Sequence, residues 1–212
     1  SMHSPHLLNC TLFAGLVEEE LNRSLAFFGA EVRRYARGEL LHAPGTVFSS
    51  FALVLEGTVQ VYCDDMEGNP MMMANVPPGE TFGESLCFLE RESPVYALAV
   101  TDCQLLHLRL IHLRHPQGAF EEELARRFTA MLAERTLAMN NRIQILSKLT
   151  LREKLITFFS QYGSAGRTFT VPFRREDMAL YLGTNRSALS RELSKMRRDG
   201  LIDFSRNTFR IL

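Results

Sequence analysis

Residues 174–198 (RREDMALYLGTNRSALSRELSKMRR) constrain the fold of this chain more than any other segment. Ala179 is small enough to let a second helix cross close by. Gly183, four residues later, can adopt a positive φ without a Cβ clash. Leu189 follows six residues after Gly183 and faces back toward the first helix. The pattern predicts two short helices joined by a sharp turn, which is the helix-turn-helix of DNA-binding proteins.

The second helix of this pair has one apolar and one polar face. Asn185 is a good N-cap, because its side-chain oxygen can accept a hydrogen bond from an unpaired backbone N–H. The predicted inward residues of the two helices are Met178, Ala179, Leu182, Leu189, Leu193 and Met196. The predicted outward residues are Arg186, Ser187, Ser190, Arg191 and Ser194. Two arginines and three small hydroxyls on one face suit a major groove. The alternative is an ordinary helical hairpin with a solvated basic face.

The formal net charge of zero conceals two oppositely charged parts. Residues 1–150 carry 12 Lys and Arg against 18 Asp and Glu, a net charge of −6. Residues 151–212 carry 12 against 6, a net charge of +6. Because attraction to phosphate is local and screened by salt, this asymmetry favours nucleic-acid binding by the C-terminal part alone.

The segment from about residue 30 to 112 has the pattern of an all-β domain. Short β-rich runs recur between turns that contain glycine or proline. The predicted strands are Phe51–Leu55, Val59–Tyr62, Met71–Val76, Val95–Val100 and Gln104–Leu108. Many short strands with regular turns indicate a small barrel or roll. Leu12–Phe28 has helical spacing, and we expect it to pack across one end of this roll.

A long helix without internal glycine or proline is predicted over residues 118–147. Phe128, Leu132, Met139, Ile143 and Leu146 follow near-heptad steps, interrupted by arginines, and predict a seam for a second helix. The alternative is that this helix lies on its own β domain. We favour a two-fold dimer, because a DNA-binding domain on a palindrome needs a symmetric partner.

The predicted domains are therefore residues 1–117, 118–149 and 150–212, in an α+β fold. Thr150 and Glu153 have capping-box spacing, which starts a fresh helix and marks a hinge. Phe169–Phe173 is a predicted strand, and Leu201–Phe204 with Phe209–Leu212 form a closing hairpin. This hairpin would be a wing, with Arg206 and Asn207 at its tip near phosphate.

Several functional classes are disfavoured by what the sequence lacks. No apolar run approaches the length of a bilayer span, and the start has no secretory apolar region, so we expect a cytoplasmic protein without a membrane partner. Ser1 before Met2 resembles the scar of a cleaved tag. The four cysteines form no CxxC pair, which favours reduced buried thiols. No nucleophile elbow, Walker-type loop or His–carboxylate pair is present, so we predict no enzymatic activity.

Taken together, the chain resembles the CRP/FNR family of bacterial transcription regulators. Residues 45–57 (GTVFSSFALVLEG) resemble the β-roll signature of that family, and residues 79–84 (GETFGE) resemble the entry to its phosphate cassette. Residues 185–193 (NRSALSREL) resemble its recognition helix. The resemblance implies a jelly-roll-like β-roll, a long dimerisation helix and a C-terminal winged helix-turn-helix. It also implies a homodimer on double-stranded DNA, an effector in the β-roll, and RNA polymerase as a further partner.

The departures from the family pattern bear on the effector. Members that bind cyclic AMP hold its phosphate with an Arg-Ser pair, whereas this chain has Ser93-Pro94 there, and proline has no N–H to donate. Cyclic AMP is therefore disfavoured, and the effector stays unknown. Gly83, Glu84 and Ser85 remain candidates to line a pocket, and Asn140 is a candidate to face it from the long helix, with a solvated position as its alternative.

Other family cofactors are also disfavoured. Cys10 is the only cysteine in the first 62 residues, so we expect no four-cysteine iron–sulfur cluster. A haem- or metal-sensing variant stays open as an alternative. Its only close histidines are His107, His112 and His115, which we interpret as surface and boundary residues, with no metal site predicted.

The recognition helix itself departs from the family at one position. Many members carry a glutamate directly after the first arginine, and this chain has Ser187. Serine discriminates less sharply between bases, so the operator should differ from the common family half-site. The resemblance places Arg186 and Arg191 at base- and phosphate-contacting positions. A second class stays open: a ligand-binding regulatory module whose basic domain meets a protein partner.

Overall fold

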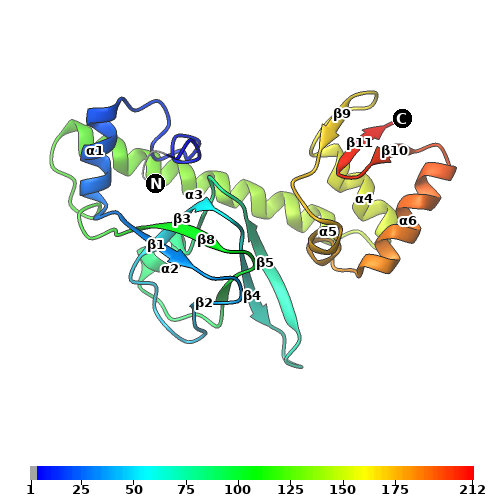
Figure 1. Ribbon diagram of the computed structural model, residues 1–212, viewed down its shortest axis with the longest axis horizontal. Helices are drawn as coiled ribbons and strands as arrows, with labels where there is room; N and C mark the ends of the chain where they lie inside the picture. The colour runs from blue at the N-terminus through cyan, green and yellow to red at the C-terminus, as the bar shows by residue number, and fades with distance from the viewer. Residues whose placement is uncertain (1–3) are drawn as a thin grey trace. The chain divides into compact units, whose positions relative to one another are not determined.

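The computed structural model describes residues 4–212 (Figure 1). The chain forms two compact units, and the boundary between them in the sequence lies between Glu134 and Arg135. The expected tag residues Ser1 and Met2 lie outside the described residues. The helices are α1 (Glu18–Phe27), α2 (Glu84–Leu89), α3 (Ala119–Leu146), α4 (Leu151–Ser160), α5 (Arg175–Tyr181) and α6 (Arg186–Arg198). The strands are β1 (Glu31–Tyr35), β2 (Leu40–His42), β3 (Phe51–Glu56), β4 (Val59–Asp64), β5 (Pro70–Val76), β6 (Thr81–Phe82), β7 (Tyr96–Ala99), β8 (Cys103–Leu108), β9 (Thr168–Thr170), β10 (Ile202–Ser205) and β11 (Thr208–Ile211).

The first unit contains two four-stranded antiparallel sheets, with strand orders β1-β8-β3-β6 and β2-β7-β4-β5. Apart from the β4–β5 hairpin, consecutive strands lie in different sheets, which is the arrangement of a β-roll. The predicted α+β class with an N-terminal roll is thus confirmed. The strands at 31–35, 40–42 and 81–82 were not predicted individually, because they are short and carry charged or turn-forming residues.

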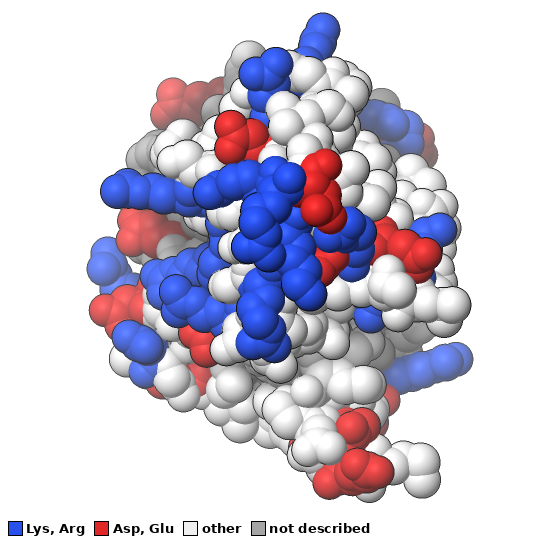
Figure 2. All heavy atoms as spheres, turned by 90° about the vertical axis from the view of Figure 1, so that its right-hand side faces the viewer, with Lys and Arg blue, Asp and Glu red and all other residues white. Residues whose placement is uncertain are grey.

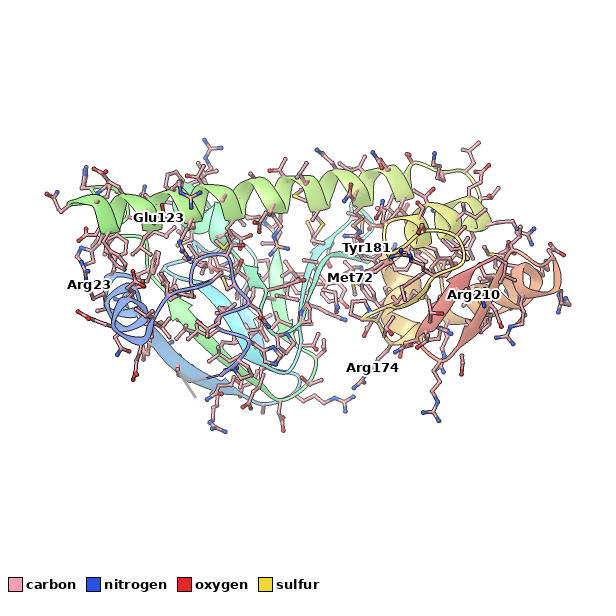
Figure 3. The ribbon with its side chains drawn as sticks, turned by 90° about the horizontal axis from the view of Figure 1, so that it is seen from above. Arg23, Met72, Glu123, Arg174, Tyr181 and Arg210 are labelled. Carbon is pink, nitrogen blue, oxygen red and sulfur yellow. The ribbon has the colours of Figure 1, made fainter. Side chains whose placement is uncertain are left out.

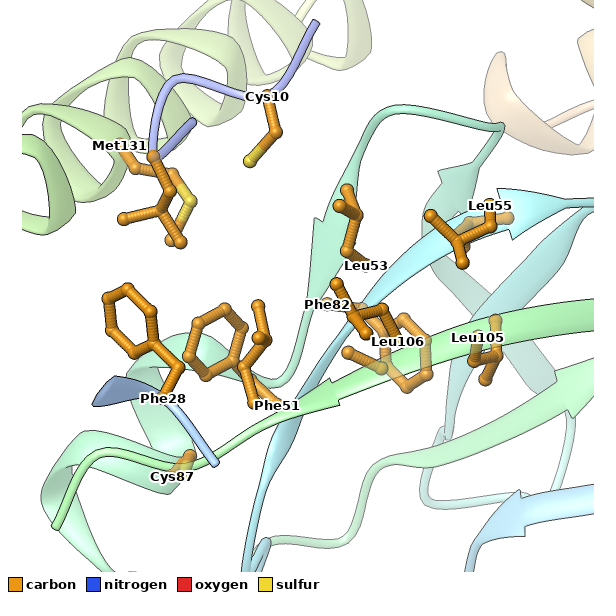
Figure 4. Close-up of a cluster of buried hydrophobic side chains, with 14 of the residues drawn as sticks. Cys10, Phe28, Phe51, Leu53, Leu55, Phe82, Cys87, Leu105, Leu106 and Met131 are labelled. Carbon is orange, nitrogen blue, oxygen red and sulfur yellow. The ribbon is translucent and has the colours of Figure 1, made fainter. Parts of the chain in front are cut away.

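Large apolar side chains from both sheets fill the roll. Phe51, Leu53 and Leu55 of β3 are fully buried and pack with Leu105 and Leu106 of β8 (Figure 4). Every residue of β3 before Glu56 is buried, so this strand has a continuous apolar run rather than an alternating one. Burial of this kind stabilises by about 25 cal/mol per Å² of apolar surface and makes this cluster the main stabilising element of the unit.

The helical segment before the roll is shorter than predicted. The pattern over Leu12–Phe28 predicted one helix, but α1 begins only at Glu18. Gly15 has φ = +73°, which interrupts a right-handed helix, and the Val17 amide donates to the Glu20 side chain at 3.2 Å. Residues 7–13 form turns instead, and Arg127 of α3 holds them by donating to the Ala14 carbonyl at 2.7 Å.

Helix α3 is one continuous helix of 28 residues, with Glu123 near its start (Figure 3). Its first half belongs to the first core, where Leu124, Phe128 and Met131 are buried. The prediction that Phe128 lies in an intermolecular seam is therefore wrong: this ring packs on Phe51, at a centroid distance of 5.7 Å. Leu132 of the predicted seam is also partly buried against this core, whereas Met139, Ile143 and Leu146 are exposed.

The end of α3 belongs to the second unit. Ile145 is fully buried in the second core, and the Arg142 guanidinium lies 4.7 Å from the centre of the Tyr181 ring in α5. Burial lowers the pKa of Arg142, whose side chain also donates to the Tyr181 carbonyl at 3.5 Å. Arg142, which interrupts the predicted seam, thus anchors α3 to the helix-turn-helix.

The second unit packs α4, α5 and α6 against a three-stranded antiparallel sheet of order β10-β11-β9. Its core is strongly aromatic, with Phe158, Phe159 and Phe209 almost fully buried. The Thr150 hydroxyl accepts from the Glu153 amide, which confirms the predicted capping box. The predicted strand at 169–173 is shorter, because the chain leaves the sheet before Pro172. None of the helices within residues 4–212 is long and apolar enough to cross a bilayer.

Candidate nucleic-acid interface and effector-facing residues

The turn between α5 and α6 has the predicted geometry. Gly183 has φ = +72°, and a Cβ there would meet only ordinary contacts at 3.8 Å, so the backbone conformation alone calls for glycine. Ala179 is buried, and the Thr184 amide donates to its carbonyl at 2.9 Å, which closes the end of α5. The predicted helix-turn-helix is confirmed in its turn, its crossing residue and its apolar face.

Helix α6 presents the predicted polar face to solvent. Leu189, Leu193 and Met196 are buried beneath it. Arg186, Ser187, Ser190 and Arg191 are all exposed. Asn185 is the N-cap, and its side-chain oxygen accepts from the Ala188 amide at 2.8 Å. That oxygen is therefore engaged in the cap, which leaves the amide NH2 group of Asn185 for an outside partner.

A forked ion pair fixes α6 to α4. The Arg152 guanidinium donates to Glu192 at 2.7 Å and lies 2.8 Å from Asp199 at the end of α6. The side chains of Arg152, Glu192 and Asp199 are 33%, 17% and 53% exposed, so the pair with Glu192 is the better shielded from solvent. This contact was not predicted from the sequence, because Arg152 and Glu192 lie 40 positions apart and no local pattern connects them.

The closing hairpin is a wing with a two-residue tip. Ser205 pairs with Thr208, which leaves Arg206 and Asn207 at the turn. Arg206 is exposed and has φ = +53°, an uncommon value for a residue with a Cβ. The Asn207 carbonyl accepts from the Val171 amide at 2.9 Å, which connects the tip to the end of β9.

Exposed basic residues are concentrated in this unit. Figure 2 shows Lys and Arg side chains gathered in a band across the end of the molecule that carries α6 and the wing. The exposed Lys and Arg residues of α5, α6, the wing and their flanks are Arg167, Arg174, Arg186, Arg191, Lys195, Arg197, Arg198, Arg206 and Arg210. Such a basic surface attracts phosphate regardless of base sequence.

Three of the four effector candidates lie together at the start of α2. Gly83 is the N-cap of that helix, Glu84 is buried and Ser85 is exposed. The fourth, Asn140, is exposed on the part of α3 that belongs to the second unit. The buried carboxylate of Glu84 is unusual, because carboxylates are seldom buried without a function or partner.

An aromatic ring covers Gly83, which sequence analysis did not anticipate. A Cβ on Gly83 would lie 2.6 Å from the Phe48 ring, and φ there is +81°. The imidazole of His42 stacks on the Phe48 ring, at a centroid distance of 3.5 Å and an interplanar angle of 7°. Burial lowers the pKa of His42. The segments that carry His42 and Phe48 thus lie next to Gly83 at the start of α2. Because Phe48 is 35 residues from Gly83 in the sequence, no local pattern predicts this contact.

The segment that replaces the family's Arg-Ser pair is held by backbone contacts. The Ser93 carbonyl accepts from the Gly45 amide at 2.8 Å, and Thr46 forms an isolated bridge with Ser93. Pro94 and Arg91 are exposed. The structure therefore presents no arginine from 91–94 toward the interior of the roll, and these residues do not fit the phosphate of a cyclic nucleotide.

His107 is a boundary residue, in agreement with the interpretation of the histidines as surface and boundary residues. It is half-buried between β1 and β3, with Tyr35 Oη 2.8 Å from its Nε2 and Ser50 Oγ 3.1 Å from its Nδ1. His112 and His115 are exposed, as expected. Within residues 4–212, no three His, Cys, Asp or Glu side chains gather in a metal-binding arrangement. Burial raises the pKa of the Cys10 thiol to about 11, so this thiol is protonated at neutral pH.

The fold and surface define a class of protein: a β-roll of the sensor type, joined by a long helix to a basic winged helix-turn-helix. The model of the cyclic nucleotide-binding domain family matches residues 32–115, and that of the Crp-like helix-turn-helix domain matches residues 153–212. The cyclic AMP receptor protein of Thermus thermophilus is 27% identical over 203 residues, covering 94% of this chain and 91% of its own. The nitrogen fixation regulation protein FixK of Bradyrhizobium diazoefficiens is 26% identical, covering 79% and 72%.

The solved structures agree with this fold. FixK2 from Bradyrhizobium japonicum superposes with a TM-score of 0.65 at 22% identity, covering 86% of this chain and 92% of its own. The chain belongs to the CRP/FNR family of transcription regulators, with a cyclic nucleotide-binding domain followed by a DNA-binding helix-turn-helix, and it is not an enzyme.

Proposed function

We propose that this regulator is a homodimer that binds an inverted repeat in double-stranded DNA through α6. The observation that carries the proposal is the exposed face of Arg186, Ser187, Ser190 and Arg191 over a fully buried apolar face. Arg186 and Arg191 would contact base edges and phosphates, and the serines would refine the fit at the groove floor. Arg206 would touch phosphate from the wing. Two such helices would lie one helical turn apart, about 34 Å.

The proposal of a dimer is supported by the free part of α3. Met139 and Ile143 are 56% and 61% exposed, and Leu146 continues the same stripe. These positions are spaced by four and three residues, as in the seam between two helices. A second copy of the same helix would bury them symmetrically, and it would supply the two-fold axis that an inverted repeat requires.

We propose that the β-roll senses a small-molecule or physical signal other than cyclic AMP. Glu84 is a buried polar residue of the first unit, with Gly83 and Ser85 beside it and Asn140 as a candidate from α3. The Phe48 ring on Gly83 and the backbone-bound Ser93-Pro94 segment support the exclusion of a cyclic phosphate. The expected result of a melting experiment with millimolar cyclic AMP is no stabilisation, whereas saturable stabilisation would contradict this exclusion.

A regulator of bacterial transcription would act in the cytoplasm, with RNA polymerase as a further partner. The experiment that tests the core proposal is selection of bound duplexes from a randomised library by the purified protein. We expect an inverted repeat whose half-site centres are about 10–10.5 base pairs apart. Enrichment of isolated, unpaired half-sites would contradict the dimeric mode, and no enrichment together with no binding would contradict DNA binding.

A further inference from the structure

The wing is held at its tip by an arginine from outside the hairpin. Arg175 is the first residue of α5, and its Nη2 donates to the carbonyl of Arg206 at 2.7 Å. Its guanidinium carbon also lies 5.0 Å from the centre of the Phe209 ring and 5.5 Å from that of Phe204. A guanidinium that both stacks and donates is fixed in direction, which a lysine ammonium would not be.

A second arginine holds the other side of the hairpin. Arg197, in the last turn of α6, donates from Nη2 to the Phe204 carbonyl at 2.7 Å. Its guanidinium carbon lies 3.6 Å from the centre of the Phe204 ring, and Asp203 lies 3.7 Å from its Nε. Arg175 and Arg197, which we call the wing clamp, therefore connect both helices of the helix-turn-helix to the wing.

The tip that the clamp holds is in a conformation that needs support. Arg206 has φ = +53°, in the left-handed region that is unfavourable for a residue with a Cβ. The carbonyl fixed by Arg175 belongs to this same residue. Fixing this peptide sets the direction in which the exposed Arg206 side chain leaves the hairpin.

Positive charges also converge where the clamp lies. Burial lowers the pKa of Arg175, and the nearby Arg186 and Arg197 guanidinium groups lower it further. Arg186 begins α6, so the clamp lies close to the start of the proposed recognition helix. A phosphate bound beside these groups would relieve their mutual repulsion.

We propose that Arg175 and Arg197 are positioning residues that fix the wing so that Arg206 meets a backbone phosphate of duplex DNA. The inference rests on the proposed DNA-binding function and adds the residues that set the wing's direction. Neither clamp residue needs to touch DNA itself. Substitutions of the clamp residues should therefore reduce DNA affinity only when Arg206 is present. A general attraction between basic residues and phosphate would not depend on Arg206.

A double-mutant cycle tests this dependence. Binding to a random-sequence duplex is measured by fluorescence anisotropy over a salt series for Arg206→Ala, Arg175→Gln and the double variant. We expect each single change to reduce the slope of log K against log salt by about 0.9 per lost phosphate contact. The double variant should lose no more binding affinity than either single variant loses alone. Fully additive losses in the double variant would overturn the proposal.

Arg174→Gln is the matched control, because Arg174 is the exposed neighbour with the same charge (Figure 3). The loss of binding free energy caused by Arg174→Gln, whatever its size, should add to the loss caused by Arg206→Ala. Equal non-additivity with Arg174→Gln would also contradict the proposal, since it would reveal coupling among all these charges. Absence of wild-type binding in every salt would instead refute the proposed function.

Hydrogen exchange supplies a readout without DNA. The Val171 amide donates to the tip carbonyl of Asn207, so its protection reports whether the tip is in place. We expect Arg175→Gln and Arg197→Gln to accelerate exchange at Val171 at least about tenfold, with Arg174→Gln unchanged. If Arg175→Gln does not fold, Arg175→Lys replaces it, with partial loss of protection expected. Unchanged protection in folded clamp variants would overturn the proposal.

Discussion

At the scale of single residues, two glycines with similar backbone angles face different surroundings. A Cβ on Gly183, where φ is +72°, would meet only ordinary contacts at 3.8 Å, whereas a Cβ on Gly83, where φ is +81°, would lie 2.6 Å from the Phe48 ring. The requirement for glycine at 183 follows from the turn and was visible in the sequence. The requirement at 83 comes additionally from a residue 35 positions away, which no local pattern contains.

This difference predicts unequal costs of the same substitution. Gly183→Ala should destabilise by about 1–2 kcal/mol, the backbone cost of the left-handed region. Gly83→Ala should cost about 1–3 kcal/mol more, because its Cβ would overlap a buried ring that is stacked on His42. Urea unfolding of both variants measures the two costs. Equal losses of unfolding free energy in the two variants would show that the Phe48 ring can move aside without cost.

His107 gives the first unit a dependence on pH. Burial and the Arg33 guanidinium lower the pKa of His107, while Glu31 opposes this shift. Its imidazole is thus neutral when folded and charges more readily in the unfolded chain. The resulting stability is complete above the unfolded pKa of about 6.5 and is lost as pH falls through it toward the lower folded value.

We therefore expect His107→Gln to lose less stability than wild type between about pH 7.5 and pH 5. Glutamine can still hydrogen-bond Tyr35 and Ser50, so the change removes the titration while keeping polar contacts. Chemical unfolding across this range measures it, with exposed His112→Gln as the control. Identical pH dependence in wild type and His107→Gln would contradict the assignment.

At the scale of elements, α3 shows where periodicity succeeds and where it fails. The spacing correctly indicated a long helix with an apolar stripe, but it did not distinguish residues that face the chain's own core from those left exposed. Phe128 is buried against β-roll residues, whereas Met139 and Ile143 are exposed. Periodicity gives a face, and only the tertiary fold decides what covers each part of it.

The exposed part of the stripe leads to a test of the dimer. Ile143→Glu should raise the dimer dissociation constant at least about tenfold, because it places charges across the proposed seam. Gln144→Glu, an exposed neighbour off the stripe, should leave the dimer intact. Analytical ultracentrifugation measures both. A protein that is monomeric at the start, or a dimer unaffected by Ile143→Glu, would contradict the proposed interface.

The helix-turn-helix was the most predictable element because its determinants are local. Gly183, Asn185 and Leu189 lie within seven residues and specify turn, cap and core contact in sequence order. The Arg152 fork and the wing clamp were not predictable, since each joins residues brought together only by the fold. In a basic segment, the sequence alone does not distinguish arginines that make contacts within the protein from arginines that face a ligand.

At the scale of the whole molecule, the division of charge matches the division of structure. The acidic part of the chain contains the β-roll, and the basic part contains α4 to β11. Helix α3 contributes residues to both cores, and Ile145 and Arg142 anchor its end in the second unit.

The exposed face of α6 is the surface that we propose contacts duplex DNA. The most direct measurement of this contact is the affinity for a random duplex over a salt series, for wild type and for the Arg186→Gln/Arg191→Gln double variant. We predict wild-type binding that weakens steeply with salt, and a double variant at least about tenfold weaker at low salt with an unchanged melting temperature. Wild type that fails to bind at low salt, or a folded double variant with wild-type affinity at every salt concentration, would contradict the account.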